Sequence, residues 1–439
     1  MGLQRTHRRT FLKQTAATAV GTLGLPYLVR SPALGNSQTS PASERITVGA
    51  IGMGAQGQYD MKVVMRDPGV QVVAICDVSE GGSGYPTWYG TDKGGRRYAK
   101  QAVEEYYAQK APSGSYKGCD VYTDFRDLLA RQDIDAVIIG TPDHWHAIMA
   151  IEAARNGKNI YCEKPLSLTI GEARAMVNAV RRYDRVFQTG SQQRSESGFR
   201  FACELVRNGY IGEIKSVIAN IGGPSGPCDL PGQPTPDFLD WDLWLGPAPW
   251  RPYNEKLHPA RWRSFWDYSG GGMTDWGAHH FDIAQWGLGM DHTGPVEVIP
   301  PDGKDIKVLT FRYANGVTLT RDQANGVLFT GTEGKIEVNR GYLKTWPESL
   351  QQVQLGPDKV HLYKSDNHHV DWLNAIRTRT KPICDVEIGA RSVTICHLGN
   401  IAYWLGRPLK WDPVSEVFPG DEEANRMLDR AQRAPWRLA

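Results

Sequence analysis

Residues 46–57 read ITVGAIGMGAQG, an apolar run of six residues followed by a turn rich in glycine. The run has the length and the Val/Ile content of a strand that is buried on both faces of a parallel sheet. Gly52, Gly54 and Gly57 then form the pattern G-x-G-x-x-G, with Met53 inside the turn. Such glycines permit a tight turn, let a pyrophosphate approach the backbone, and let the next helix pack closely on the strand. The stretch predicts a doubly wound α/β domain that binds a dinucleotide.

An acidic residue stands at the position expected for ribose recognition. Asp77 follows a second apolar run, Val70–Cys76, and lies twenty residues beyond Gly57. A carboxylate at this point can accept hydrogen bonds from both ribose hydroxyls, and it repels a 2′-phosphate. The sequence therefore favours NAD over NADP.

Apolar runs alternate with helical stretches up to Pro165, which indicates a succession of βαβ units and a Rossmann domain over residues 46–166. Residues 81–118 interrupt the alternation and are expected to form a long loop and one helix. Strands are predicted at 46–51, 70–76, 134–140 and 159–162, and helices at 57–66, 98–109, 124–131 and 146–156.

The pattern changes after residue 166. Turn signals such as Asn325-Gly326 separate short alternating runs, which indicates a largely antiparallel sheet. We expect a second α/β domain over residues 167–439. Its strands are predicted at 213–221, 306–313, 317–322, 327–330 and 335–339, and its helices at 169–182, 198–207, 367–379 and 386–405.

The N-terminus resembles an export signal. Residues 7–13 read HRRTFLK, a modestly apolar stretch follows, and Ala33-x-Gly35 is a plausible cleavage site. Twin arginines in this setting are typical of the Tat route, which carries folded proteins. We therefore expect a signal peptide at residues 1–35, a linker at 36–45, and a periplasmic or other extracytoplasmic location.

Composition narrows the function further. The chain has 439 residues, 41% of them apolar and 22% charged, which suits two globular domains and a leader. Without residues 1–35 it holds 45 basic and 48 acidic residues, so it carries no cationic field for nucleic acid. No apolar run is long enough to span a membrane in the mature chain. The seven cysteines form no C-x-x-C pair, and one disulfide of open pairing is compatible with export.

Two motifs follow predicted strands of the first domain, at the sheet edge where such folds bind ligands. The first is Thr141-Pro142-Asp143-His144-Trp145-His146, and the second is Glu163-Lys164-Pro165. The two histidines of the first motif could suggest a metal, but no third ligand lies near them in the sequence, so we expect no metal. Contact with the nicotinamide half of the cofactor is the favoured interpretation of the first motif.

A third motif lies in the second domain, where residues 270–282 read GGGMTDWGAHHFD. Asp275 and His279 are four residues apart and would share one face of a helix. Such a pair can supply a proton acceptor and the carboxylate that orients it. His280 would point elsewhere.

Together these motifs resemble the Gfo/Idh/MocA oxidoreductases in residue type, order and spacing. The resemblance extends over nearly all of residues 45–413. It implies a Rossmann domain followed by an α/β domain with a large open sheet that often forms oligomers, here a dimer or tetramer. It further implies catalytic roles for Lys164, Asp275 and His279, and a Lys164–Pro165 bond that is often cis.

The same resemblance implies that several other positions line the cofactor or the substrate. Relatives use positions equivalent to Gln193, Trp262 and Arg263, in addition to Thr141, Pro142, Trp145, His146 and Glu163. In the implied reaction, His279 removes a hydroxyl proton, Asp275 orients its imidazole, and Lys164 stabilises the alkoxide.

The expected function is transfer of a hydride between a secondary alcohol of a sugar or polyol and a nicotinamide. Two other functions stay open. One is a redox-neutral glycosidase similar to the NAD-dependent α-N-acetylgalactosaminidases, and the other is a sugar- or dinucleotide-binding protein without catalysis.

Overall fold

The structure is a computed structural model that describes residue 41 and residues 44–438. One compact unit begins at Ile46 and runs to the end of the chain. The predicted export signal and most of the predicted linker lie outside the described residues.

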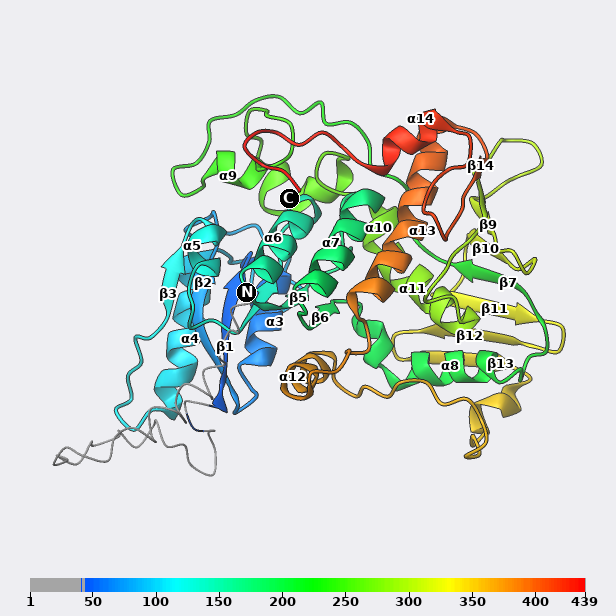
Figure 1. Cartoon of the computed structure of the whole chain (residues 1–439), viewed down its shortest axis with the longest axis horizontal. Helices are drawn as coiled ribbons and strands as arrows, with labels where there is room; N and C mark the ends of the chain where they lie inside the picture. The colour runs from blue at the N-terminus through cyan, green and yellow to red at the C-terminus, as the bar shows by residue number, and fades with distance from the viewer. Residues whose placement is uncertain (1–40, 42–43, 439) are drawn as a thin grey trace, which may run out of the picture. The chain divides into compact units, whose positions relative to one another are not determined.

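The first half of this unit is a six-stranded, wholly parallel sheet in the order β3-β2-β1-β4-β5-β6. Helices lie on both of its faces, as the blue and cyan segments of Figure 1 show. The strand pattern predicted from the Val- and Ile-rich runs is confirmed. The strands are β1 (Ile46–Ile51), β2 (Val70–Cys76), β3 (Asp120–Tyr122), β4 (Ala136–Ile139), β5 (Asn159–Cys162) and β6 (Phe187–Thr189).

The helices of this half begin close to the predicted residues, and side chains fix two of the starts. Asp124 accepts a hydrogen bond from the backbone of Arg126, and Thr169 accepts one from Glu172, so each satisfies an otherwise unpaired N–H. The helices are α3 (Ala55–Val64), α4 (Arg96–Lys110), α5 (Phe125–Leu129), α6 (Asp143–Arg155) and α7 (Ile170–Arg182).

The parallel sheet continues past the boundary predicted at residue 166. Helix α7 leads into β6, which pairs with β5, so the first sheet is completed only at Thr189. Helix α12 (His368–Thr378) also returns to this half, where Trp372 and Leu373 join the core between the sheet and α3. The sequence places neither segment there, because both depend on pairing between distant residues.

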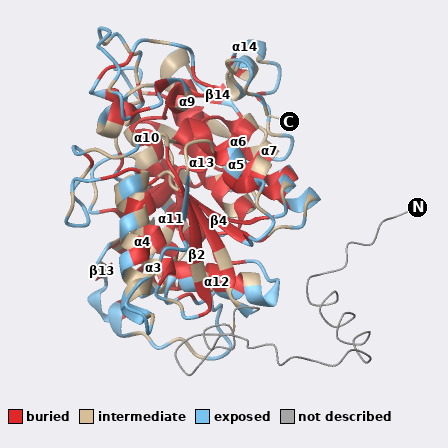
Figure 2. Ribbon diagram, turned by 90° about the vertical axis from the view of Figure 1, so that its left-hand side faces the viewer, coloured by how far each residue is buried: buried red, intermediate tan, exposed pale blue. Residues whose placement is uncertain are grey.

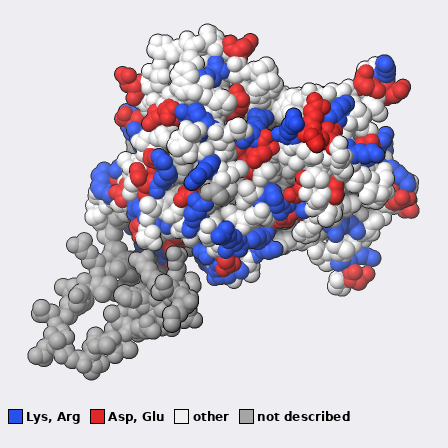
Figure 3. Space-filling view, turned by 45° about the horizontal axis from the view of Figure 1, so that its top comes forward, with Lys and Arg blue, Asp and Glu red and all other residues white. Residues whose placement is uncertain are grey.

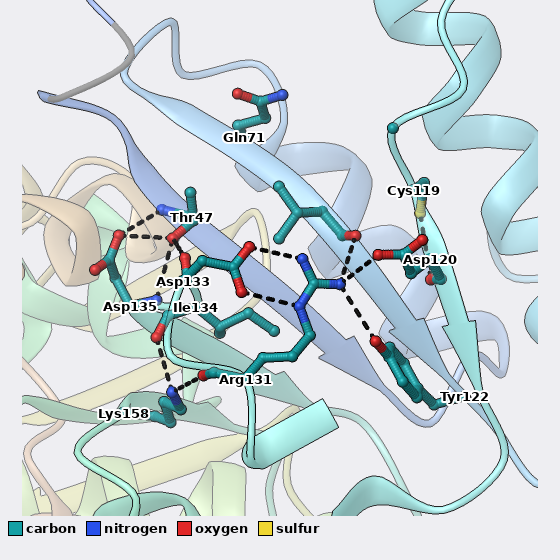
Figure 4. Close-up of polar contacts among 12 residues, drawn as sticks. Thr47, Gln71, Cys119, Asp120, Tyr122, Arg131, Asp133, Ile134, Asp135 and Lys158 are labelled. Atoms are coloured by element: carbon teal, nitrogen blue, oxygen red, sulfur yellow. Dashed lines mark hydrogen bonds and ion pairs between the residues drawn. The ribbon is translucent and has the colours of Figure 1, made fainter. Parts of the chain in front are cut away.

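A polar network fastens the amino ends of the parallel strands (Figure 4). The guanidinium of Arg131 reaches Asp120 and Asp133, each at 2.7 Å. Thr47 at the start of β1 bonds the Asp135 carboxylate ahead of β4. The carboxyl ends of the parallel strands lie at the opposite edge of the sheet.

The second half is built on an eight-stranded sheet in the order β13-β12-β11-β7-β10-β9-β8-β14. Only the β7–β10 pair is parallel, and the other pairs are antiparallel. The predicted fold class is confirmed. The strands are β7 (Ile214–Ala219), β8 (Glu297–Ile299), β9 (Thr310–Arg312), β10 (Thr318–Arg321), β11 (Val327–Gly331), β12 (Lys335–Asn339), β13 (Tyr342–Trp346) and β14 (Leu409–Lys410).

Three helices cover the inner face of this sheet: α8 (Ser197–Arg207), α11 (Gly277–Leu288) and α13 (Val386–Leu405). Phe281 and Phe311 meet edge to face at 5.2 Å in the core between helices and sheet. Figure 2 shows the buried residues gathered in these central elements, with exposed residues on the loops and outer surfaces. Alternate side chains of β7 and β11, such as Ile218 and Leu328, point away from that core and are half-buried.

The surface carries both signs of charge. On the face drawn in Figure 3, lysine and arginine are interspersed with aspartate and glutamate. None of the described helices is both long and apolar enough to cross a lipid bilayer. All seven cysteines are free thiols, so the disulfide allowed by the sequence is not formed.

Candidate active site

A cleft opens at the carboxyl ends of β1, β2, β4 and β5. Segments from both halves of the molecule line it. The predicted site residues that it brings together are Gly52, Gly54, Asp77, Thr141, Pro142, Trp145, Glu163, Lys164, Trp262 and Arg263.

The glycine-rich turn has the geometry that a dinucleotide requires. Gly52 has φ +81°, and a Cβ added there would lie 2.6 Å from the backbone nitrogen of Thr141. A Cβ on Gly57 would lie 2.0 Å from the Gly52 carbonyl oxygen, so helix α3 packs directly on the turn. Gly54 precedes α3, whose first turn holds no acidic residue, so the helix terminus offers N–H groups to an anion.

Asp77 lies where β2 ends, with both carboxylate oxygens already engaged. Oδ2 accepts a hydrogen bond from the Met53 N–H at 2.5 Å, and Oδ1 accepts one from the Ser79 N–H at 2.7 Å. Burial raises the pKa of Asp77 to about 6, and these backbone bonds limit the rise. Met53 itself is fully buried, so it contributes backbone rather than a side chain to the site.

Lys164 extends from the end of β5 and pairs with Asp275 from the second half. Its Nζ lies 2.6 Å from Oδ1 and 3.1 Å from the carbonyl oxygen of Asp275. The Nε of Arg263 lies 3.5 Å from the same carboxylate oxygen. Burial alone would raise the pKa of Asp275, but the charges of Lys164 and Arg263 hold it below its usual value. The Lys164–Pro165 bond is cis, as the family resemblance implied.

The helix expected across Asp275 and His279 is interrupted, which changes the predicted pairing. Asp275 ends α10 (Gly272–Asp275), and α11 starts only at Gly277. The His279 N–H bonds the carbonyl of Trp276, and the carbonyl of Asp275 is left free to accept from Lys164. Among the hydrogen bonds of the described residues, none joins Asp275 to His279. Asp275 therefore orients Lys164 in this structure. The expectation that Asp275 orients the imidazole of His279 is not met by these contacts.

His279 has the properties of a proton acceptor. It is buried, and its Nδ1 has no hydrogen-bond partner among the described residues. Burial lowers its pKa well below the usual value, and the charges of Lys164 and Arg340 lower it further, so the imidazole is neutral. The ring of the neighbouring His280 turns away and contacts the carbonyl oxygen of Asn220 at 2.7 Å.

Some predicted cofactor residues lie behind the cleft instead of lining it. The His146 ring contacts the carbonyl oxygens of Thr141 and Pro165 at 2.9 and 2.8 Å, so it holds those two segments together. Gln193 is buried beside the His279 backbone. No group of three potential metal ligands from His, Cys, Asp and Glu occurs within the described part of the chain.

The cleft also contains residues that the sequence motifs do not indicate. Tyr85 and Trp88 come from the long insert, and the Tyr85 hydroxyl lies 3.2 Å from Nε2 of His258. The Arg263 guanidinium lies 4.2 Å from the ring centroid of Trp262 and 5.7 Å from that of Trp88. The aromatic content of the insert was the available signal, but its fold onto the cleft is a long-range contact.

A buried pair of carboxyl groups lies behind Lys164. Asp60 of α3 accepts hydrogen bonds from Gln56 and His369, each at 2.9 Å. Burial raises the pKa of Asp60 and of the nearby Glu163, and the charge of Asp60 raises that of Glu163 further. The pair therefore retains protons that exposed carboxyls would lose.

Comparison with protein families identifies both halves. Residues 97–191 match a model described as the oxidoreductase family, NAD-binding Rossmann fold. Residues 222–438 match the C-terminal alpha/beta domain of the same oxidoreductase family. The chain belongs to the Gfo/Idh/MocA family. It thus has the NAD-binding Rossmann domain and the C-terminal domain of this oxidoreductase family.

Among curated proteins, this chain is similar to the alpha-N-acetylgalactosaminidase of Shewanella oneidensis. The two are 30% identical over an alignment of 223 residues, and the match covers 47% of this chain and 44% of the relative. A glycosyl hydrolase family 109 protein of Shewanella sp. strain ANA-3 matches with the same identity and coverage. The chain thus spans less than half the length of these relatives.

Solved structures share the fold. The aldose-aldose oxidoreductase of Caulobacter crescentus, complexed with glycerol, matches with a TM-score of 0.55 and 18% identity, over 83% of this chain and 99% of that one. The WlbA dehydrogenase of Bordetella pertussis, complexed with NADH and UDP-GlcNAcA, matches with a TM-score of 0.55 and 20% identity, over 84% and 99%.

Proposed function

We propose that this protein is an oxidoreductase that transfers a hydride between a nicotinamide cofactor and a CH–OH group of a sugar or polyol. One observation carries the proposal. The Lys164 ammonium enters a cleft that also holds a glycine-rich turn and Asp77, and it is held there by Asp275. The substrate class is supported by two structurally similar proteins, an aldose-aldose oxidoreductase complexed with glycerol and a dehydrogenase complexed with UDP-GlcNAcA.

The cleft residues fit a dinucleotide. Gly52, Gly54 and the start of α3 would hold the pyrophosphate, and Asp77 would hold the adenosine ribose, with NAD preferred over NADP. When bound, the nicotinamide would accept a hydride from the substrate carbon or return one to it. Trp262 and Arg263, at the Lys164 side of the cleft, are proposed to contact its nicotinamide half.

The proton chemistry is assigned to side chains of this chain. Lys164 donates a hydrogen bond to the substrate oxygen and stabilises negative charge as it develops. The neutral imidazole of His279 accepts the hydroxyl proton. Asp275 positions the Lys164 ammonium through the 2.6 Å contact.

The direct test follows absorbance of the reduced nicotinamide after a panel of sugars and polyols is added to the purified protein. We expect a signal with at least one sugar, and mass spectrometry of the unsupplemented protein shows whether a dinucleotide is retained. Retained cofactor without reduction by any sugar would favour a binding protein that has lost catalysis.

A second candidate is a glycosidase that oxidises a sugar transiently, eliminates the aglycone and then reduces the product. The similarity to the Shewanella oneidensis alpha-N-acetylgalactosaminidase favours it. Incubation with nitrophenyl α-N-acetylgalactosaminide, without added NAD, separates the two functions. Release of nitrophenol would support hydrolysis, and reduced nicotinamide without release would support the dehydrogenase.

Two further proposals concern location and assembly. The twin arginines Arg8 and Arg9 support export by the Tat route, with the cofactor bound before transport. The outward side chains of the eight-stranded sheet, among them Ile218 and Leu328, support a homodimer or homotetramer through this face. Analytical ultracentrifugation of the Leu328→Glu variant tests the assembly, because a charge in that interface would dissociate it.

A further inference from the structure

An arginine outside the recognised motifs faces the catalytic segment. Arg340 is exposed and lies in the turn that joins β12 to β13. Its guanidinium carbon lies 5.2 Å from the ring centroid of Trp276, the residue between α10 and α11. The same indole ring lies 5.8 Å from the His279 ring. One aromatic side chain therefore contacts both Arg340 and His279.

A buried amide holds Arg340 in this position. With the Gln193 amide oriented so that both of its polar atoms are satisfied, its oxygen accepts from Nε of Arg340 at 3.1 Å. Its nitrogen then donates to the carbonyl oxygen of His279 at 3.2 Å. Gln193 is 1% exposed, so this contact is fixed by the protein core. The outer nitrogens of the guanidinium keep their donors for another partner.

The charge around Arg340 is not balanced by the protein. Lys164 and Arg263 share the single carboxylate of Asp275, and no described residue forms an ion pair with Arg340. Glu196 is the remaining acid nearby. Burial raises the pKa of Glu196, and the positive charge of Arg340 partly offsets this rise. The two side chains do not form an ion pair. Among the described ion pairs, Lys164 and Arg263 thus share Asp275, and Arg340 has no carboxylate partner.

The open side of this cationic site is aromatic. Trp276 is 41% exposed beneath Arg340, and Trp88 is 60% exposed beside Arg263. Exposed indole faces stack on the C–H faces of sugar rings, and a planar guanidinium with free donors binds a carboxylate through two parallel hydrogen bonds. A neutral sugar would use the indole faces and leave the guanidinium unpaired.

We propose that the substrate is a sugar that carries a carboxylate, such as a hexuronic acid, with Arg340 binding the carboxylate while the ring packs on Trp276. This assignment names the substrate class of the proposed oxidoreductase and rests on that function for turnover only. The carboxylate is bound and not transformed, so the oxidised group is still a CH–OH of the ring.

Binding is measured by quenching of tryptophan fluorescence in the full-length protein as purified. The probes are D-glucuronate, D-galacturonate and the methyl ester of each, because the ester keeps the ring and removes the charge. We expect at least one acid to bind about 10- to 100-fold more tightly than its ester, the value of a charge-assisted hydrogen-bond pair. Equal binding of acid and ester, or no binding of either acid, overturns the proposal.

Variants assign the preference to Arg340. In Arg340→Gln the acid-to-ester preference should fall to about 1, and Arg340→Lys should restore part of it because it returns the charge without the planar fork. Lys344→Gln is the matched control, since Lys344 is an exposed cation of the same hairpin whose ring contact is Trp346. Loss of preference in Lys344→Gln, or its retention in Arg340→Gln, contradicts the assignment.

Two further measurements distinguish this proposal from a phosphate site and from the proposed oxidoreductase function. Tighter binding of glucose 6-phosphate than of either uronate would overturn the carboxylate in favour of a phosphate. Absorbance of reduced nicotinamide is recorded in parallel. A preference for the acid without reduction of the nicotinamide would refute the oxidoreductase and support the carboxylate site. Equal reduction with esters and acids would support the oxidoreductase and refute the carboxylate site.

Discussion

The Nζ of Lys164 lies 2.6 Å from Oδ1 of Asp275, a contact between residues 111 positions apart that joins the two halves of the protein at the cleft. Because Asp275 also supplies its backbone carbonyl at 3.1 Å, the ammonium is held by two acceptors of one residue. The break between α10 and α11 makes this possible, since a continuous helix would have used that carbonyl.

This contact predicts unequal effects of two variants. Lys164→Met removes the donor to the substrate oxygen, so kcat should fall by about 10²- to 10⁴-fold. Asp275→Asn keeps the shape and the carbonyl but removes the charge that orients Lys164, so its loss should be smaller. Steady-state kinetics gives both values, and mass spectrometry checks that each variant retains its dinucleotide. Near-normal turnover in Lys164→Met would refute the assigned role.

His279 predicts an unusual pH dependence. Burial lowers its pKa well below the usual value, so the imidazole stays neutral and able to accept a proton as the pH falls. The rate of sugar oxidation should therefore show no loss with an apparent pKa near the usual histidine value of about 6.5. His279→Ala should abolish oxidation across the range. A wild-type acid limb centred near the ordinary histidine value would contradict the buried, neutral state.

Much of the fold could be predicted from local sequence. The runs at 46–51, 70–76 and 159–162 form strands with the predicted bounds, because buried parallel strands are marked by continuous Val and Ile. The glycine-rich turn was equally clear, since Gly52 and Gly57 occupy positions where any Cβ would collide with backbone.

The site was predicted less well, for a physical reason. The sequence GGGMTDWGAHH carries no signal for the break at Trp276, and its four-residue spacing favoured an Asp275–His279 pair. The competing partner, Lys164, lies in another domain, so the choice depends on a tertiary contact. The same holds for Arg340, which approaches His279 only because the β12–β13 turn folds against the catalytic segment.

The buried carboxyls predict lower stability at alkaline pH. Unfolded Asp60 and Glu163 ionise near pH 4, whereas in the folded protein burial raises the pKa of each to about 8. Their contribution to stability is complete below about pH 4 and is lost as the pH rises through about 8. The midpoint of thermal unfolding should fall between about pH 4 and pH 8 and level off above about pH 8, where both carboxyls are ionised in either state. The midpoint should fall less in Glu163→Gln, because the glutamine side chain cannot ionise. Calorimetry measures the midpoint against pH for both proteins, and parallel curves would contradict the prediction.

Asp77 predicts cofactor preference. Its carboxylate is fixed by the Met53 and Ser79 N–H groups at the end of β2, where it would repel a 2′-phosphate. Asp77→Asn should weaken NAD binding and raise NADP binding relative to NAD, by about tenfold or more in the ratio. Titration of the cofactor-free protein with both dinucleotides measures it. Glu80→Gln is the control, because Glu80 is exposed, lies three residues away and does not line the cleft.

The aspartate that ends the motif at residues 270–282 predicts an effect on stability. Asp282 of α11 is fully buried, where it accepts from Nε of Arg194 at 2.8 Å and from the Ser392 hydroxyl at 2.6 Å. Arg194 is itself 1% exposed and also pairs with Asp291 at 2.7 Å. This network fixes the helix that carries His279, and without the Asp282 charge the buried guanidinium of Arg194 keeps Asp291 as its carboxylate partner.

Asp282→Asn should therefore lower the free energy of unfolding by about 1–3 kcal/mol, the usual cost of a weakened buried hydrogen-bond network in which one carboxylate partner remains. Glu297→Gln is the matched control: Glu297 pairs with the exposed Arg312 at 2.8 Å, and its loss should cost at most about 1 kcal/mol. Chemical denaturation of both variants measures the difference. Equal losses would mean that the buried network does not stabilise α11, and the position of His279 would then depend on the helix contacts with the sheet alone.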